Sequence, residues 1–303
     1  MTANVLLLRS PSEDGGPDKY EGALHAQGYR AVSVPVLETV HKNLDKLAEV
    51  LRRRGTLPNG CTKYSGVIVT SARACEAWQE VVQRLSDSDD TSATDVQGSS
   101  WSTVPFYVVG AATASALSAI RAAHPTSSYV PHEIRGGAES GTAEKLAKFI
   151  LSDLPEAPAP EGRTLLYLTG DKNRDTLPKI LGEGGLKLES LQVYATQGSS
   201  RFEEDLKAAL AEASVEGTER WWIVHFAPSA ANTVAPTLEK YFDMPSAANA
   251  SSVGRRARIA CIGPTTATFL RNELHVEVAV VAEKPTPEAL SEGIATWDHA
   301  HQW

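Results

Sequence analysis

The sequence predicts two α/β domains, each built on a doubly wound, mostly parallel sheet with helices on both faces. Three observations lead to this prediction. Short apolar segments alternate with segments of helical periodicity along the 303 residues. Glycine, serine and threonine cluster where several of the apolar segments end. The order of these segments in the first half of the chain returns in the second half, and the length suits two domains of ordinary size.

The best-marked turn lies within Arg258 to Leu270. Strand-compatible residues lead into Gly263-Pro264-Thr265-Thr266, after which a helical apolar pattern begins. Backbone N–H groups at a helix start have no intrahelical partner and attract anions. Taken alone, the stretch also fits a plain strand-to-helix turn with a threonine cap. The layout occurs a second time in Val104 to Leu117, which favours a shared role in binding.

Five strands and the helices between them are expected in the first half. Pro35 indicates that pairing of the second strand ends there, because proline has no N–H to donate to a sheet. Thr142 is a good N-cap for the last helix. The expected strands are 4–8, 31–37, 66–71, 104–109 and 129–130, and the expected helices are 20–27, 44–51, 72–85, 110–123 and 142–151.

From residue 164 onward the order of segments begins again. The expected strands 164–168, 188–194, 221–226, 258–261 and 278–282 correspond in turn to the five strands of the first half. The acidic, serine-rich segment 86–102 is expected to be a mobile loop, and the proline-rich segment 155–160 a connector. Taken as contiguous repeats, the two halves place a domain boundary near residue 155. The Gly, Ser and Thr clusters fall at carboxyl ends of strands, where open α/β sheets bind ligands.

Composition excludes several classes of function. The net charge is -8 and the longest basic run is Arg52-Arg53-Arg54, which suits the end of a helix, so we expect no nucleic-acid partner. The three cysteines have no C-x-x-C spacing, which favours a reducing compartment and argues against a zinc knuckle. No apolar run approaches the roughly 18 residues that span a bilayer. We therefore expect a cytoplasmic protein without a membrane partner.

Several catalytic signatures are absent. The sequence has no P-loop and no G-x-S-x-G elbow, and Gly182 to Lys187 only begins like a dinucleotide-binding motif and follows a helix. The eight histidines are scattered, so we expect no metal site. His225 lies within an apolar strand and is interpreted as a core histidine with satisfied hydrogen bonds.

The residues that remain at the strand ends are mostly neutral hydrogen-bond donors with a few cations. This set is poorly suited to hydrolysis or proton abstraction, which need tuned acids and bases. It is well suited to binding an anionic ligand through backbone N–H groups and hydroxyls. The donors are Thr70, Ser71, Thr113, Ser229, Thr265 and Thr266, and the cations are Arg9, Arg73 and Arg174.

The chain resembles the uroporphyrinogen-III synthase family. Each motif alone is weak, but all occur in the order of the family and together cover nearly the whole chain. The motifs are Val5–Arg9, Val34–Glu38, Val69–Arg73, Val108–Ala114, Leu191–Thr196, Ile262–Ala267 and Pro285–Leu290.

The resemblance implies an arrangement that contiguous repeats do not predict. In this family two α/β domains are joined by a two-stranded ladder and enclose a cleft that holds the active site. The first domain would combine residues 1–36 with 198–303, and the second would comprise residues 40–193. The linkers would be residues 37–39 and 194–197.

The reaction that the resemblance implies is cyclisation of hydroxymethylbilane to uroporphyrinogen III, with loss of water and inversion of the last ring, and with no metal or organic cofactor. Tyr194 is the candidate acid, with a packed linker aromatic as the alternative. Arg174 could bind a carboxylate, although a solvated loop charge fits equally well. The candidate substrate-binding residues are Arg9, Thr70, Ser71, Gly110, Thr113, Gly170, Arg174, Ser229, Gly263, Thr265 and Thr266.

Two positions depart from the pattern of the family. Ala227 stands where the family often has serine, and Ala111 stands where the family can place a polar residue, which favours recognition by backbone groups. The expected ligand is a linear tetrapyrrole, with transient contact to the enzyme that forms it, and the expected state is a monomer. A different class of function, an intracellular two-lobed binding protein for an anionic metabolite, also fits. A sugar-phosphate enzyme would need an acid/base pair that the sequence does not offer.

Overall fold

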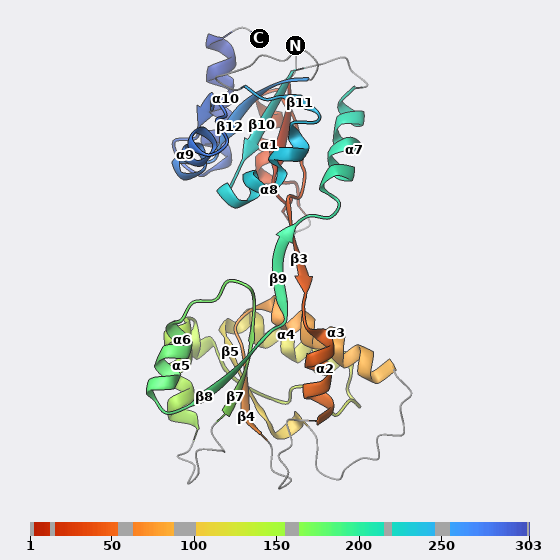
Figure 1. Cartoon of the computed structure of the whole chain (residues 1–303), viewed down its shortest axis with the longest axis vertical. Coiled ribbons are helices and arrows are strands. Elements are labelled where there is room, and N and C mark those ends of the chain that lie inside the picture. The colour runs from red at the N-terminus through yellow and green to blue at the C-terminus, as the bar shows by residue number, and fades with distance from the viewer. Residues whose placement is uncertain are drawn as a thin grey trace. The chain divides into compact units, whose positions relative to one another are not determined.

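The computed structural model describes residues 3–12, 16–53, 63–87, 101–154, 164–214, 220–245, 255–301 and 303. Its contacts divide the chain into two units (Figure 1): unit 1 holds Met1–Glu38 and Gln197–Trp303, and unit 2 holds Thr39–Thr196. A boundary near residue 155, as contiguous repeats suggested, is therefore wrong. Among the described helices, none is both long and apolar enough to cross a membrane.

Unit 1 is built on a parallel sheet that combines strands from both ends of the chain. The order is β11-β12-β10-β1-β2, and β13 also pairs with β12, beyond β11 along the same edge. Because β1 pairs with β10 on one side and with β2 on the other, the N-terminal strand lies inside a sheet completed by the last third of the chain. The strands are β1 (Asn4–Leu8), β2 (Arg30–Ser33), β10 (Trp221–His225), β11 (Phe242–Asp243), β12 (Arg255–Cys261) and β13 (Val280–Val281).

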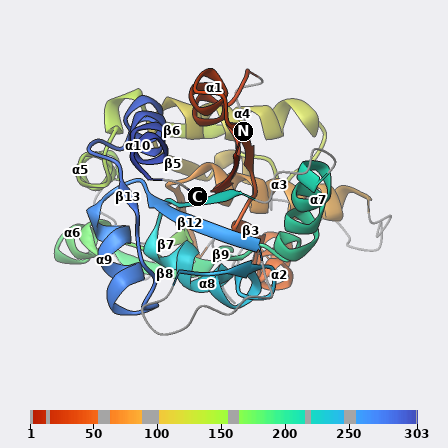
Figure 2. The ribbon, with the colours of Figure 1, turned by 90° about the horizontal axis from the view of Figure 1, so that it is seen from above.

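Helices cover both faces of this sheet (Figure 2). The helices α1 (Lys19–Ala26) and α10 (Pro287–Ala300) bury Leu24 and Leu290 against one face. The other face packs against α7 (Phe202–Ser214), α8 (Pro228–Leu238) and α9 (Pro264–Asn272). Side chains alternate along each strand. Trp222 therefore packs on the face covered by α1 and α10, while Trp221 packs on the face covered by α7, α8 and α9.

Unit 2 has the same plan, with five parallel strands in the order β6-β5-β4-β7-β8. The strands are β4 (Tyr64–Val69), β5 (Pro105–Val109), β6 (Glu133–Gly137), β7 (Thr164–Thr169) and β8 (Lys187–Gln192). One face packs against α2 (Leu44–Arg53), α3 (Ala72–Asp87) and α4 (Gly110–Ala123), and the other against α5 (Ala143–Asp153) and α6 (Thr176–Glu183). Short 3-10 turns, η1 (Trp101–Thr103) and η2 (Ala138–Ser140), lie beside the sheet.

Two further strands, β3 (Leu37–His41) and β9 (Tyr194–Gly198), pair with each other. The chain leaves unit 1 through β3 and returns to it through β9, so the two strands run in opposite directions between the units. The predicted fold class, two doubly wound α/β domains joined by a two-stranded ladder, is confirmed.

Three details differ from the sequence-based expectations. Residues 129–130 form no strand, and β6 begins only at Glu133, after Pro131. The expected strand 278–282 is reduced to Val280–Val281. Of the expected mobile loop 86–102, residues 88–100 lie outside the described residues, while α3 reaches Asp87 and Trp101 is buried. The connector 155–160 also lies outside them.

A network around Asp18 fixes the segment between β1 and α1. Asp18 is the N-cap of α1 and accepts hydrogen bonds from the amides of Tyr20 and Glu21. Its other oxygen accepts from Arg9 Nη1 at 2.7 Å and from the Ser12 amide at 2.9 Å. Burial by itself would raise the pKa of Asp18, but these hydrogen bonds outweigh burial and lower it to about 2.

We predict that Asp18→Asn destabilises unit 1 by about 2 kcal/mol at pH 7, because the carboxylate pKa falls by nearly two units on folding. The wild-type contribution is present above pH 3.8 and is lost as the pH falls towards 2. Urea unfolding at pH 7 and pH 2.5 tests this, with Asp45→Asn as control because that side chain is fully exposed. Equal losses for Asp18→Asn at both pH values would contradict the electrostatic origin.

His225, at the end of β10, is buried as expected, with 1% of its surface exposed. The expectation of satisfied hydrogen bonds is wrong, because neither ring nitrogen has a partner among the described residues. Burial lowers the pKa of His225 to about 4, since the charged imidazolium would be poorly solvated there.

We predict that His225→Phe removes a pH-dependent loss of stability. The unfolded chain binds a proton at this residue below pH 6.5 and the folded chain only below about pH 4, so wild-type stability falls by up to about 3 kcal/mol across that range. Urea unfolding between pH 7 and pH 4 measures the slope. The exposed His132, changed to Asn, serves as control and should leave the slope unchanged. The prediction would be refuted if the free energy of unfolding of His225→Phe fell with pH as steeply as that of the wild type.

Candidate functional site

Two helices of unit 1 begin at the carboxyl ends of neighbouring strands without side-chain caps. The N-cap residues Ala227 of α8 and Gly263 of α9 make no side-chain cap hydrogen bond, and each is followed by a proline. Three other helices, α1, α5 and α10, have side-chain caps from Asp18, Thr142 and Thr286. The first-turn N–H groups of α8 and α9 are thus left for an outside acceptor.

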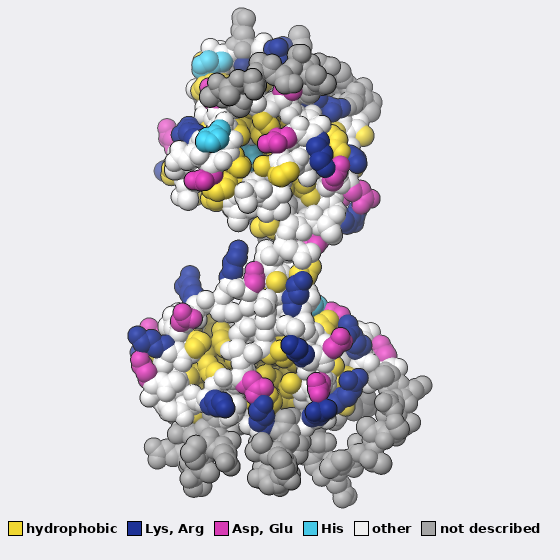
Figure 3. Space-filling view, viewed as in Figure 1, with side chains coloured by type: hydrophobic (Ala, Val, Ile, Leu, Met, Phe, Trp, Pro, Cys, Tyr) yellow, Lys and Arg dark blue, Asp and Glu magenta, His cyan; other side chains and the backbone are white. Residues whose placement is uncertain are grey.

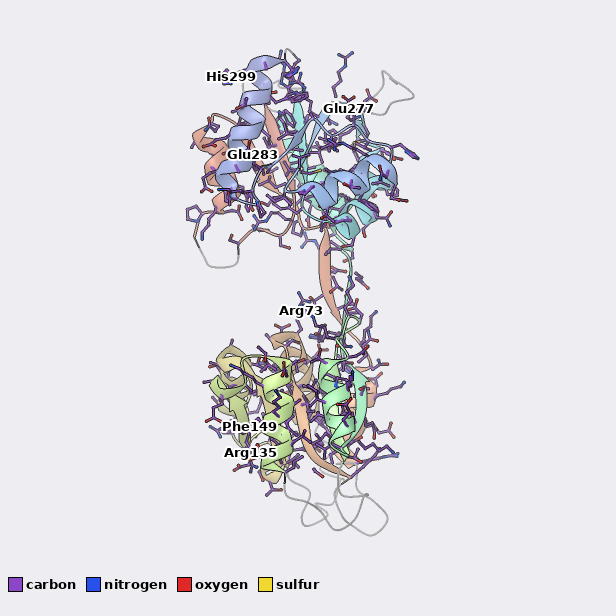
Figure 4. The ribbon with its side chains drawn as sticks, turned by 90° about the vertical axis from the view of Figure 1, so that its left-hand side faces the viewer. Arg73, Arg135, Phe149, Glu277, Glu283 and His299 are labelled. Carbon is purple, nitrogen blue, oxygen red and sulfur yellow. The ribbon has the colours of Figure 1, made fainter. Side chains whose placement is uncertain are left out.

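These two helix starts border one pocket of about 320 Å³. Its wall combines apolar side chains with the hydroxyls and backbone groups of α9, which suits a ligand with both apolar rings and anionic groups. Glu283, which precedes α10 (Figure 4), brings a carboxylate to the rim. The lining residues are Phe226, Ala227, Pro228, Ile262, Gly263, Pro264, Thr265, Thr266, Ala282, Glu283 and Pro285.

The structure brings three of the predicted residues of unit 1, Gly263, Thr265 and Thr266, into this pocket. Thr265 is exposed, whereas Thr266 is 3% exposed. The alternative of a threonine cap is wrong, because Gly263 is the N-cap and both threonines lie inside α9. Ser229 is exposed in the first turn of α8 but does not line the pocket.

Arg9 lies behind the pocket wall and is paired. Its guanidinium bonds to Asp18 and lies 5.0 Å and 5.6 Å from the ring centroids of Tyr20 and Phe226. The Tyr20 hydroxyl donates to the Pro285 carbonyl at 3.2 Å. Phe226 and Pro285 both line the pocket, so Arg9 supports its wall while its charge is offset by Asp18.

In unit 2, Tyr194 lies against the turn that follows β7. A Cβ atom on Gly170 would lie 2.5 Å from Tyr194 Cε2, so only glycine allows this approach of the ring. The Asn173 side chain closes the turn, donating to the Gly170 carbonyl at 2.7 Å and accepting from its amide at 3.2 Å. The Arg73 guanidinium carbon lies 5.9 Å from the centroid of the Tyr194 ring.

Thr70 and Ser71, two further predicted residues of unit 2, follow strand β4. Thr70 is hydrogen-bonded to Tyr167, a buried phenol whose pKa is raised chiefly by burial and whose neighbour is Tyr194. The Ser71 hydroxyl accepts from the Ala74 amide at 3.3 Å and so serves the start of α3. The sequence analysis placed Tyr167 in the expected strand 164–168 and gave it no part in the site.

The start of α4 repeats the uncapped arrangement of unit 1. Its N-cap, Val109, makes no side-chain cap hydrogen bond, and Gly110 has a φ of +77°, a conformation that favours glycine. Thr113 is only 6% exposed, and its carbonyl faces the thiol of Cys75. Backbone groups rather than the Thr113 hydroxyl are therefore presented at this helix start.

Lys and Arg side chains lie at the end of unit 2 from which the ladder strands leave, as they do elsewhere on this unit (Figure 3). Arg73 lies at this end in Figure 4 and is exposed. Arg174 is exposed in the turn after β7. Within the described residues, no three His, Cys, Asp or Glu side chains are grouped closely enough to hold a metal ion.

Comparison with solved structures finds matches that cover nearly the whole chain. A uroporphyrinogen III synthase from the bacterium Thermus thermophilus matches over 99% of this chain and 100% of its own, with 16% identity and a TM-score of 0.40. A uroporphyrinogen-III synthetase from Helicobacter pylori matches over 97% of this chain and 99% of its own, with 15% identity and a TM-score of 0.43.

Sequence relatives match over nearly the whole chain. A uroporphyrinogen-III synthase from Saccharomyces cerevisiae is 28% identical over 291 residues, which cover 96% of this chain and 94% of its own. One from Schizosaccharomyces pombe is 28% identical over 297 residues, covering 97% of each chain. The family model described as uroporphyrinogen-III synthase HemD matches residues 18–292. By this match, the chain belongs to the uroporphyrinogen-III synthase family.

Proposed function

We propose that this chain is a uroporphyrinogen-III synthase, a hydro-lyase of tetrapyrrole biosynthesis that cyclises hydroxymethylbilane to uroporphyrinogen III with loss of water and inversion of the last ring. Membership of the family supports the activity. The observation that supports the substrate is the pocket of unit 1, where two uncapped helix starts meet apolar walls.

The pocket matches the chemistry of this substrate. Each pyrrole ring of the bilane carries an acetate and a propionate, so the molecule combines flat apolar rings with many carboxylates. The first-turn amides of α8 and α9, with the Thr265 hydroxyl, can donate to carboxylates, while Phe226 and Ile262 contact a ring. Thr70, Gly110 and the exposed Arg73 and Arg174 of unit 2 would bind further carboxylates.

Tyr194 is the proposed acid. Its phenol carries a proton that it can donate to the departing hydroxyl. The lone pair of the pyrrole nitrogen then expels the protonated hydroxyl as water, so the C–O bond breaks and a protonated azafulvene and a Tyr194 phenolate remain. The proton that the substrate loses as the ring closes returns to this phenolate. The turn at Gly170 supports the proposal, because it fixes the ring of Tyr194 while leaving the residue only partly buried.

The main catalytic task under this proposal is to hold the bilane in one conformation. Spontaneous closure gives the non-inverted isomer, so the protein must favour the folded substrate that leads to inversion. Many weak donors on rigid helix starts suit this task better than one strong base. We further propose that the chain acts as a monomer in the cytoplasm, with transient contact to the enzyme that supplies the bilane.

The first test supplies hydroxymethylbilane to the purified protein and measures the isomer ratio of the product by chromatography. We expect the inverted isomer to predominate, because bound substrate closes faster than free substrate. Product that contains only the non-inverted isomer, formed at the spontaneous rate, would overturn the proposal. Binding of the bilane without turnover would instead favour the binding-protein alternative.

We predict that Tyr194→Phe lowers kcat by about 100-fold without loss of the fold, because the phenylalanine ring still fits over Gly170 but has no proton to donate. Steady-state kinetics and circular dichroism check this.

Tyr167→Phe is the matched control for Tyr194→Phe. Tyr167 is a neighbour of Tyr194, but only 5% of its surface is exposed. Its phenol is therefore not available to substrate, and turnover should stay near wild type. Near wild-type turnover in Tyr194→Phe would remove Tyr194 from the acid role. A large loss in Tyr167→Phe alone would transfer that role to Tyr167.

A further inference from the structure

His225 and Cys261 are partners on neighbouring strands. In the parallel pairing of β10 with β12 they lie opposite each other, at the carboxyl ends of both strands. Cys261 belongs to the core cluster beneath α7, α8 and α9, and His225 points to the same face because Trp221 and Ile223 of its strand do. His225 is 1% exposed and Cys261 is 0% exposed, so both side chains are enclosed on this face of the sheet.

Neither side chain has a hydrogen-bond partner there among the described residues. Both nitrogens of His225 are unpartnered, and no hydrogen bond of the Cys261 thiol is found in that part of the chain. Cys75, the other buried cysteine, differs, since its thiol faces the carbonyls of Ser71 and Thr113. A buried imidazole without a partner is costly, which suggests that it has a ligand to bind.

The spacing of the strands suits a metal ion between the two side chains. Neighbouring strands lie about 4.8 Å apart, and a sulfur and a nitrogen bonded to a d10 ion on opposite sides lie about 4.3 Å apart. Thiolate and imidazole are ligands that soft ions prefer. We propose that Cys261 and His225 bind one monovalent d10 cation, of the class of Cu(I), in two-coordinate geometry.

The charges of the site fit a monovalent ion better than a divalent one. A thiolate, a neutral imidazole and a monovalent cation sum to zero, and a neutral group is the least costly to bury. Arg271 of α9 is the charged group that acts on Cys261, where it favours the thiolate, and burial is what acts on His225. A divalent ion would leave one uncompensated positive charge beside Arg271.

Binding must displace a proton. Burial raises the pKa of the Cys261 thiol to about 12, so the free site holds a thiol at neutral pH. The step is therefore Cys261–SH plus M⁺ giving Cys261–S–M plus H⁺, with the lone pair of a His225 nitrogen completing the coordination and no change of oxidation state. One proton should be released per ion, and affinity should rise with pH.

The ion would enter through the pocket of unit 1. Phe226 and Ile262, which directly follow His225 and Cys261 in the sequence, both line that pocket. Local opening of the pocket wall would expose the two strand ends. The proposal depends on the packing of unit 1 and not on the proposed reaction, so the two can fail independently.

The test uses Ag(I) as probe, because it shares the charge and the soft character of Cu(I) and stays monovalent in air. The full chain carries Cys61→Ser, since Cys61 lies outside the described residues and would bind silver by itself. After desalting, elemental analysis should find one silver per chain. A weakly buffered titration should record one proton released per silver.

Four variants on this background decide the outcome. Cys261→Ala and Cys261→Ser should retain no silver, and His225→Phe should bind it at least about 10-fold more weakly. Cys75→Ala is the matched control and should behave like the parent, because the Cys75 thiol is buried but faces two backbone carbonyls instead of an imidazole. Unchanged affinity in a folded His225→Phe variant, loss of silver in Cys75→Ala alone, or no retained silver in the parent would overturn the proposal.

Discussion

The parallel pairing of β1 with β10 governs the architecture of the whole chain. It places the N-terminal strand inside a sheet whose other members include strands from the end of the chain. The pairing of β4 with β7 does the same for unit 2. Once these pairs form, the chain must leave unit 1 and return to it, and the segments that do so pair as β3 and β9. The ladder is thus a consequence of how the strands are shared.

The same pairing explains why the candidate site consists of backbone groups. In a parallel sheet the carboxyl ends of the strands meet at one edge, and the helices that follow begin there. In α4, α8 and α9 no side chain caps that beginning, so N–H groups are presented to a ligand. Such a surface binds carboxylates without offering a strong nucleophile, which suits a reaction through an electron-poor intermediate. Tyr194, held over Gly170, adds a proton donor to this otherwise neutral set.

The edge that we propose to bind ligand also carries unfavourable features. His225 ends β10 with no hydrogen-bond partner among the described residues, one residue before the pocket wall. Its cost should appear as falling stability below pH 6.5, and a soft cation shared with Cys261 would remove that cost. Arg9 shows the opposite case, because Asp18 offsets its charge and the two together hold the chain that leads into α1. Stability and binding are therefore connected at this end of unit 1.

The class of the fold and the correspondence between strands of its two halves could be predicted from the sequence alone. The repeat predicted that β7, β8, β10 and β12 correspond to β1, β2, β4 and β5, and these pairs do occupy equivalent places in the two sheets. The turn at Gly263 was also located in this way, because turn and helix-start signals are local. Which strands share a sheet is settled only in the folded chain, since apolar parallel strands are interchangeable by pattern alone. Three features of the site were likewise beyond prediction, because they depend on residues distant in sequence. They are the burial of Thr113 and Thr266, the pairing of Arg9, and the lack of a partner for His225 among the described residues.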